Sequence, residues 1–400
     1  MSERTRIIVI GGGYAGVMAA NRVLKRDDVD VTLINERPTF VERIRLHQLV
    51  GGSNDAVVSY GDVLAARIRL VVDTVSRIDA AARRVILESG DELTYDYLIY
   101  TVGSHSAAAT VPGAAEFAHP LSTLEEAERV RARLDGTPSG APVVVVGAGP
   151  SGIETAAELA ETGRAVTLVC GGILGPYLHK SGRRSVARHL AALRVTVLQG
   201  PDAVVTSVMR DAVELRDGRH LASALTIWTA GFAASDLAAR SGLATDPSGR
   251  LLTDETLTSI DDDRIVAGGD AASPSGLPFR MSCQAAGPLG AHAADTVLNR
   301  IAGTNPHPIE LGFAGQCISL GRRAGVFQFA HKNDTALLLY IGGAAGAKVK
   351  ELVCWGTVKQ LVDEAKRPGA LRWGWSKDSS RARLLEAKRD ETVAAVGRAA

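Results

Sequence analysis

The 400-residue chain has few aromatic residues, few cysteines and almost no net charge. Only 4% of its residues are aromatic, which is too few for an extended surface that stacks bases. Lysine and arginine number 45 against 44 aspartates and glutamates, so the formal charge of +1 offers little attraction to a phosphate backbone. These shortages argue against a nucleic-acid-binding protein, whereas 46% hydrophobic residues are typical of a globular one.

The cysteines are four and lie far apart, at Cys170, Cys283, Cys317 and Cys354. They form no C-x-x-C pair and have no histidine at zinc spacing, so neither a disulfide scaffold nor a metal site is expected. This usage fits a reducing cytoplasm, and the N-terminus runs into an apolar strand without a signal-peptide pattern. The longest uncharged stretches, 98–115 and 136–153, are interrupted by Gly, Pro and Ser, so no transmembrane helix is expected; peripheral contact with the inner face of a membrane stays open.

Glycine is abundant, with 42 residues, and it gathers beside apolar runs. Residues 6–10 (RIIVI) enter Gly11-x-Gly13-x-x-Gly16, and a helix over 17–25 and a strand over 29–34 follow, which makes one βαβ unit. The first glycine permits the tight turn, the second lets the backbone approach a pyrophosphate, and the third lets helix and strand pack closely. Glu36, placed 20 residues after Gly16, would accept hydrogen bonds from ribose hydroxyls. The turn therefore predicts a dinucleotide site, to which we also assign Tyr14, Ala15 and Arg37.

The same pattern recurs in the middle of the chain. Residues 142–146 (PVVVV) enter Gly147-x-Gly149-x-x-Gly152, which contains Pro150 and Ser151, and a helix over 153–162 and a strand over 165–169 follow. Each copy is later followed by a strand that runs into T-x-G, at Thr101–Gly103 and Thr229–Gly231. The sequence therefore predicts two dinucleotide sites.

The second copy lacks the acid, because alignment of the two strands places Gly171 opposite Glu36. Without a carboxylate a 2′-phosphate is not repelled, and downstream cations could attract it: His179, Lys180, Arg183 and Arg184. The alternative is that these cations form a solvated face. NADH and NADPH both stay open.

With Gly268-Gly269-Asp270 downstream, the doubled pattern resembles the flavoproteins with two dinucleotide-binding domains, over residues 5–305. The resemblance implies an α/β fold with two Rossmann-like domains and a smaller C-terminal α+β domain. It implies FAD at the first site and NADH or NADPH at the second, with Gly231 lining the second. Gly269 and Asp270 would then bind the FAD ribityl or phosphate region, Thr101 and Gly103 would line the FAD site, and Val75 would meet adenine through its backbone.

Within that superfamily the chain is most similar to type II NADH dehydrogenases. Disulfide reductases carry C-x-x-x-x-C where this chain has no cysteine, at 40–52, so a dithiol relay is excluded there. Residues 147–154 (GAGPSGIE) are similar to the GGGPTGVE of the type II enzymes, which implies that Glu154 lies near the nicotinamide. Residues 318–322 (ISLGR) are similar to their C-terminal IGR segment.

One departure concerns the acceptor. Where those enzymes have AQxxxQ, this chain has Cys283-Gln284 and then Pro288 in place of the second glutamine. Gln284 and the start of a helix expected over 289–301 would stabilise charge on a reduced flavin, unless Gln284 only caps the helix. His47 lies where redox cysteines would be and either manages protons beside the flavin or is an ordinary buried histidine. Cys170, Cys317 and Cys354 are interpreted as packing residues.

A helix is expected over 347–366, with apolar residues on one side, and it has two interpretations. It packs on its own chain or on a partner, which we favour, or it lies on a membrane. Lys348, Lys350, Lys359 and Lys366 flank the apolar stripe.

These observations predict a discontinuous FAD domain (1–115 and 245–305), an NAD(P)H domain (116–244) and a C-terminal domain (306–400). The expected activity is an FAD-dependent NAD(P)H oxidoreductase (EC 1.6 class) that passes hydride to the flavin and electrons on to a quinone or another small acceptor. We assign catalytic roles to Glu154, Gln284 and His47. Two alternatives stay open: a flavoenzyme that acts on a specialised metabolite, and a slow NAD(P)H sensor of the apoptosis-inducing-factor type. A homodimer is compatible with each.

Overall fold

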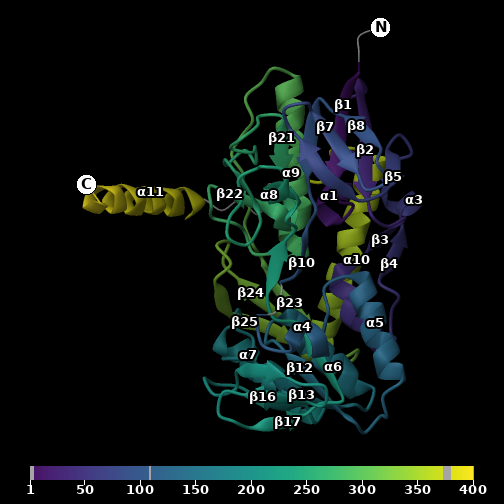
Figure 1. Ribbon diagram of the computed structural model, residues 1–400, viewed down its shortest axis with the longest axis vertical. Helices are drawn as coiled ribbons and strands as arrows, with labels where there is room; N and C mark the ends of the chain where they lie inside the picture. Colours follow the sequence, from purple (N-terminus) through teal and green to yellow (C-terminus); the bar gives the residue numbers. More distant parts are fainter. Residues whose placement is uncertain (1–3, 108–109, 373–379, 400) are drawn as a thin grey trace.

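The computed structural model describes residues 4–107, 110–372 and 380–399. Its elements form two halves stacked along the long axis, with the N-terminal strands in one half and residues 118–228 in the other (Figure 1). The helix α10 (Gly343–Lys366) runs between them, and α11 (Ser380–Ala399) projects sideways from the body.

The first half is built on a five-stranded parallel sheet in the order β21-β9-β1-β2-β5. Strands β1 (Thr5–Ile10) and β2 (Val29–Asn35) flank α1 (Tyr14–Val23), as the sequence predicts. The other members are β5 (Arg69–Val72), β9 (Tyr97–Tyr100) and β21 (Ile265–Ala267). Because β21 comes from the segment after residue 245, two distant stretches of chain share one sheet.

The second half repeats this architecture in the order β11-β18-β12-β13-β14. Its central strands are β12 (Pro142–Val146) and β13 (Ala165–Val169), joined by α6 (Pro150–Glu161). The registers also correspond, since Ile10 pairs with Ile34 in one sheet and Val146 with Val169 in the other. The remaining strands are β11 (Ala118–Pro120), β14 (Thr196–Leu198) and β18 (Leu225–Trp228).

Each half also carries a small antiparallel sheet before its strand that ends in T-x-G. The first comprises β6 (Val75–Asp79), β7 (Arg84–Leu87) and β8 (Glu92–Thr94); the second comprises β15 (Val205–Val208), β16 (Ala212–Leu215) and β17 (His220–Ala222). Three strand pairs complete the two halves: β3 (Thr39–Val41) with β4 (Val57–Ser59), β10 (Ser104–Ser106) with β19 (Phe232–Ala234), and β20 (Leu251–Thr253) with β22 (Ala272–Pro274).

Short helices and two longer ones cover the sheets. The short ones are η1 (Arg43–Arg45), α2 (Leu46–Gly51), α3 (Tyr60–Val63), α4 (Ala114–Phe117), α8 (Leu237–Arg240) and η2 (Gly269–Ala271). The longer ones are α5 (Leu124–Asp135) and α7 (Lys180–Ala192). In sequence, Ser122-x-x-Glu125 has the pattern of a capping box for α5. The box forms one residue later, where Thr123 and Glu126 exchange the reciprocal hydrogen bonds.

The helix α9 (Cys283–Ile301) begins six residues before the predicted start at 289. Ser282 caps it by accepting a hydrogen bond from the amide of Ala285 at 3.3 Å, so Pro288 lies inside the helix. The prediction was wrong because a proline was taken to mark the start of the helix, whereas a proline in the second turn is accommodated here.

The C-terminal segment adds an antiparallel sheet of β23 (Gly315–Ser319), β24 (Gly325–Ala330) and β25 (Ala336–Gly342). Helix α10 then packs on β24 and on α1. Leu361 is buried in the core of the first half, with Val358 and Val362 against it. The helix therefore packs on its own chain, in agreement with the interpretation we favoured.

Candidate active site between the two halves

The first glycine turn is shaped by close backbone approaches. A Cβ on Gly11 (φ +93°) would lie 2.4 Å from the carbonyl oxygen of Thr101, and one on Gly16 would lie 1.8 Å from that of Gly11. A Cβ on Gly13, in contrast, would meet nothing within 4 Å, and Gly13 forms the N-terminus of α1 with Tyr14 and Ala15. The open space lies where helical N–H groups are free to bind an anion, as a pyrophosphate requires.

The second turn repeats this geometry closely. A Cβ on Gly147 (φ +125°) would lie 2.5 Å from Oγ1 of Thr229, and one on Gly152 would lie 1.9 Å from the oxygen of Gly147. Gly149 faces open space, and Pro150 and Ser151 begin α6 behind it. The two turns are therefore equivalent anion cradles.

The threonine of each T-x-G motif holds its turn in place. Thr101 donates from Oγ1 to the oxygens of Ile10 (2.8 Å) and Gly11 (3.1 Å), and Thr229 donates to the oxygen of Val146 at 2.9 Å. The glycines that follow, Gly103 (φ +71°) and Gly231 (φ +84°), turn the chain away from the strand.

The rest of the first site lies along the carboxyl ends of the strands. Glu36 is exposed after β2 and pairs with Arg37, which also pairs with Glu125 of α5 and lowers the pKa of that carboxyl to about 2. Two residues that the sequence analysis did not assign hold the backbone of the turn at Gly12. The side-chain oxygen of Asn35 accepts a hydrogen bond from the amide of Gly12, and the Tyr60 hydroxyl donates one to the carbonyl oxygen of Gly12, both at 2.8 Å.

Asp270 lies at the other end of this site. It accepts a hydrogen bond from Oγ of Ser104 at 2.8 Å and lies 3.5 Å from the guanidinium of Arg43. Gly269 (φ +69°) packs against Ala15, and Val75 begins β6 in a buried position. The turn, Glu36, Val75 and Asp270 thus lie on one half, and the open cradle at Gly13 fits FAD.

A cluster of buried polar side chains lies where α2, α6, β23 and α10 meet. The Nζ of Lys350 lies 2.8 Å from Oε1 of Glu154, which also accepts from the amide of Ser319 at 2.9 Å. His47 lies 2.9 Å from Oγ of Ser319 and 3.6 Å from Glu154. The exposed fraction is 4% for Lys350 and 5% for both Glu154 and His47.

Burial and pairing set the charges of this cluster. Burial alone would raise the pKa of Glu154, but Lys350 and His47 outweigh it and hold that pKa below its usual value. Burial opposes the charge of Lys350 as well, and Glu154 outweighs it, so the ammonium keeps a raised pKa. Burial lowers the pKa of His47 to about 4. At neutral pH the cluster is therefore an ion pair beside a neutral imidazole.

Three thiols and a phenol extend the cluster toward the first glycine turn. Burial raises the pKa of the thiols of Cys317, Cys354 and Cys283, the last at the start of α9, and the nearby ammonium of Lys350 only partly opposes this. Cys283 in turn interacts with Tyr14, whose buried hydroxyl has a raised pKa because of burial. Burial also raises the pKa of the Cys283 and Cys354 thiols to about 12, so they are protonated.

Three predicted site residues make other contacts. Gln284, with its amide nitrogen toward Gly315, donates to that oxygen and accepts from the amide of Ala314, both at 2.9 Å. Arg183 donates to the oxygen of Leu178 at 3.0 Å, and Arg184 lines a hollow beside Tyr340. The assigned ligand contacts of these side chains remain predictions.

Lys350 corrects an expectation, because it is not a flanking surface cation but one of the most buried polar residues of α10. The signal was present in the sequence, since Gly346, Lys350, Cys354 and Leu361 recur at helical spacing and share the buried face. Ser319, the other missed member, is contributed by β23, which approaches α6 only in the folded chain.

Two equivalent nucleotide cradles, each at the end of a parallel five-stranded sheet, define a doubled Rossmann-type oxidoreductase. Residues 5–294 match the family described as pyridine nucleotide-disulphide oxidoreductase, and the chain belongs to that family. It is an FAD-dependent NAD(P)H oxidoreductase. The binding of its cofactors at Gly13 and Gly149 stays a prediction, with which the open space at both glycines agrees.

Relatives and solved structures agree with this family. An NADH dehydrogenase-like protein of Mycobacterium tuberculosis is 33% identical over 325 residues, which cover 74% of this chain and 80% of that protein. Its type II NADH:quinone oxidoreductase Ndh is 28% identical over 354 residues, covering 76% and 74%. NDH2 of Plasmodium falciparum, solved with NADH, has the same fold at a TM-score of 0.75 and 17% identity, covering 94% of this chain and 99% of that one.

Within the described ranges, no group of three or more His, Cys, Asp or Glu side chains could hold a metal ion. In the same ranges, no helix has the length and apolar character that crossing a bilayer requires.

Proposed function

We propose that this chain transfers electrons from NAD(P)H through FAD to a quinone, like the type II NADH:quinone oxidoreductases it is similar to. The observation that carries the proposal is the buried Lys350–Glu154 pair beside the neutral His47. It joins α6, the helix that begins at the second cradle, to α10, which also packs on α1, the helix that begins at the first. Reduction of a quinone to a quinol needs two electrons and two protons. NAD(P)H supplies both electrons and one proton, so a second proton must come from a group at the site or from water.

FAD held at the first cradle would supply the redox chemistry that links the nicotinamide to the acceptor. The chain does the rest. The cradles at Gly13 and Gly149 bind the pyrophosphates, and the apolar surroundings of the cluster exclude water. Lys350 holds a proton at Nζ and positive charge where an acceptor gains negative charge, while Glu154 fixes the position of the ammonium. The amide of Ser319 holds Glu154 in turn, and His47 is hydrogen-bonded to the hydroxyl of Ser319.

The thiols of the cluster do not provide an alternative relay. A dithiol relay needs a thiolate, and burial keeps Cys283, Cys317 and Cys354 protonated. This favours direct transfer to a small acceptor.

A bilayer is the natural source of a quinone, and the C-terminal elements support peripheral contact. Leu338 and Leu339 of β25 and Leu352 and Trp355 of α10 are each more than half exposed. The homodimer remains a prediction.

The experiment follows flavin absorbance anaerobically while NADH or NADPH and then a water-soluble quinone are added to the purified holoenzyme. Bleaching by the nicotinamide that the quinone reverses is the expected result. Bleaching without reoxidation would overturn the quinone assignment and favour a specialised metabolite as acceptor or a sensing role. A flavin that neither nicotinamide bleaches would refute electron entry through the second cradle.

Two variants test the role of the cluster. Lys350→Met should slow reoxidation by the quinone at least tenfold, while Lys348→Met, two residues away on the exposed side of α10, should leave it unchanged. Equal reoxidation rates in the two variants would remove Lys350 from the mechanism.

A further inference from the structure

The second cradle lacks the acidic group that recognises a ribose in the first. The two sheets have matching registers: the amide of Gly147 donates to the oxygen of Val169, as the amide of Gly11 donates to that of Ile34. Cys170 and Gly171 therefore occupy the positions that Asn35 and Glu36 have in the first half. A carboxylate at this place binds the 2′-hydroxyl of an adenosine ribose and repels a 2′-phosphate. With Gly171 there, that repulsion is absent.

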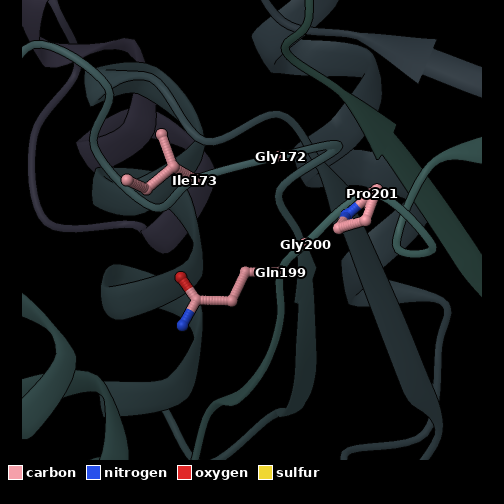
Figure 2. Close-up of a pocket in the computed structure, with 5 residues that line it drawn as sticks. All are labelled: Gly172, Ile173, Gln199, Gly200 and Pro201. Atoms are coloured by element: carbon pink, nitrogen blue, oxygen red, sulfur yellow. The ribbon is translucent and has the colours of Figure 1, made fainter.

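A pocket of about 460 Å³ lies at this strand end. It is lined by Gly172, Ile173, Gln199, Gly200 and Pro201, and Figure 2 shows the side chains of Ile173, Gln199 and Pro201 around it. Its two walls are tied together, since the amide of Gly171 donates to Ala203 and that of Gly200 to Gly172, at 2.9 and 2.6 Å. No carboxylate is among the residues that line it. The pocket is shallow and open, and it lies at the strand end where the adenosine end of a dinucleotide bound at Gly149 is expected.

One cation stands at the rim of this pocket. Arg216, between β16 and β17, donates from Nη1 to the oxygen of Pro201 at 3.1 Å. Among the described residues this hydrogen bond goes to a carbonyl oxygen and not to a carboxylate. The next arginine, Arg219, is paired with Asp217 at 2.7 Å. The exposed Asp202 follows Pro201 in the sequence and carries the opposite charge to Arg216.

We propose that the pocket accepts the 2′-phosphate of NADPH and that the side chain of Arg216 recognises this phosphate. NADPH therefore reduces the enzyme at least as well as NADH does. The inference rests on the part of the proposed function in which NAD(P)H binds at the second cradle, and it does not depend on which acceptor the enzyme reduces. Arg216 is an alternative to Arg183, which donates to the oxygens of Gly175 and Leu178, and to Arg184, which lines a hollow together with Tyr340.

The test separates binding from turnover. Calorimetric titration of the oxidised holoenzyme with 2′,5′-ADP and with 5′-AMP measures recognition of the 2′-phosphate alone, and stopped-flow bleaching with NADPH and NADH measures reduction. Arg216→Ala should weaken 2′,5′-ADP about tenfold, the effect expected for loss of a charge-assisted hydrogen bond, and should leave 5′-AMP unchanged. Arg219→Ala, which removes a neighbouring cation, is the matched control and should change neither.

A second pair of variants adds a side chain to the pocket, charged in one variant and uncharged in the other. A Cβ on Gly172 would meet nothing within 4 Å, and its φ is not in the left-handed region, so a side chain is tolerated there. Gly172→Asp should weaken 2′,5′-ADP and slow reduction by NADPH, while the uncharged Gly172→Asn should do so far less.

Equal affinity for the two mononucleotides in the parent enzyme, or an Arg216→Ala effect no larger than that of Arg219→Ala, would overturn the inference. If neither nicotinamide bleaches the flavin, the proposed function fails, but the titration still decides whether the pocket recognises the phosphate.

Discussion

Lys350 and Glu154 are two opposite charges in a place from which water is excluded. Removing one partner of such a pair leaves the other charge buried and uncompensated, which costs about 3–5 kcal/mol. We expect Lys350→Met to lower the free energy of unfolding by about that amount, and the double variant with Glu154→Gln to recover much of the loss. Urea unfolding of the four forms in a double-mutant cycle measures this coupling. Strictly additive losses would show that the two side chains do not interact.

His47 gives the cluster a pH dependence. Its pKa is about 4 in the folded chain against about 6.5 when exposed, because burial disfavours the imidazolium. Below pH 6.5 the unfolded chain binds the extra proton more readily, so stability is fully present above pH 6.5 and is lost as pH falls toward 4. The loss amounts to about 3 kcal/mol over this window.

Replacement of His47 by glutamine isolates this contribution from that of the carboxylates. The urea midpoint of His47→Gln should fall less than that of the parent chain between pH 7 and pH 4.5. His220→Gln, which alters an exposed histidine on β17, should follow the parent. Parallel curves for His47→Gln and the parent would contradict the buried neutral imidazole.

Single residues could be predicted from the sequence where they belong to a structure that a short stretch of chain forms by itself. Gly13 and Gly149 could be assigned from their spacing, because a turn between strand and helix is a local structure. The contact of His47 with Ser319 joins positions 272 residues apart, and no local pattern encodes it. Lys350 was placed on the wrong side of its helix because a lysine is expected in water unless its partner is known, and the partner lies on α6.

The two glycine turns are the elements for which substitution should separate the two cofactors. Glutamate at Gly13 or Gly149 would extend from a Cβ that meets nothing within 4 Å, so neither fold should be disrupted, but its carboxylate would lie where a pyrophosphate binds. Gly13→Glu should purify folded and without flavin. Gly149→Glu should retain flavin that NAD(P)H no longer bleaches. Absorbance at the flavin bands and circular dichroism distinguish these results, and a flavin-loaded Gly13→Glu protein would refute the assignment of the first cradle.

Element order was predictable where hydrophobic runs and turn residues agree, as in β1-α1-β2 and β12-α6-β13. Element ends were less so. The capping box of α5 has two adjacent solutions in sequence, Ser122 with Glu125 or Thr123 with Glu126, and the packing of the helix decides between them. The early start of α9 depends on the hydrogen bond from the amide of Ala285 to Ser282. Proline is common at the first position of a helix, so Pro288 suggests a later start in the sequence.

Across the whole molecule, α10 ties the halves to the C-terminal sheet. Lys350 reaches α6 of the second half, and Arg22 of α1 pairs with Glu364 at 3.2 Å in the first. Glu351 lies 3.0 Å from Arg45, which follows the first half's β3, and 2.9 Å from Arg322 beyond β23. One helix therefore fixes the separation of the two cradles, on which hydride transfer depends because the reacting atoms must come within van der Waals contact.

Glu351 is half exposed, and its ion pairs are therefore open to screening by salt, whereas the Lys350–Glu154 pair is not. We expect the rate of flavin reduction at saturating nicotinamide to fall as ionic strength rises, by up to about fivefold, which corresponds to the roughly 1 kcal/mol that exposed pairs contribute at most. Glu351→Gln should show the lower rate already at low salt and should lose most of the salt dependence. Glu92→Gln, which removes an exposed pair with Arg84 on the β7–β8 hairpin, is the matched control and should behave like the parent enzyme. An unchanged salt response in Glu351→Gln would show that the halves keep their separation without this link, and that the buried contacts of Lys350 and Leu361 suffice to hold the cradles in register.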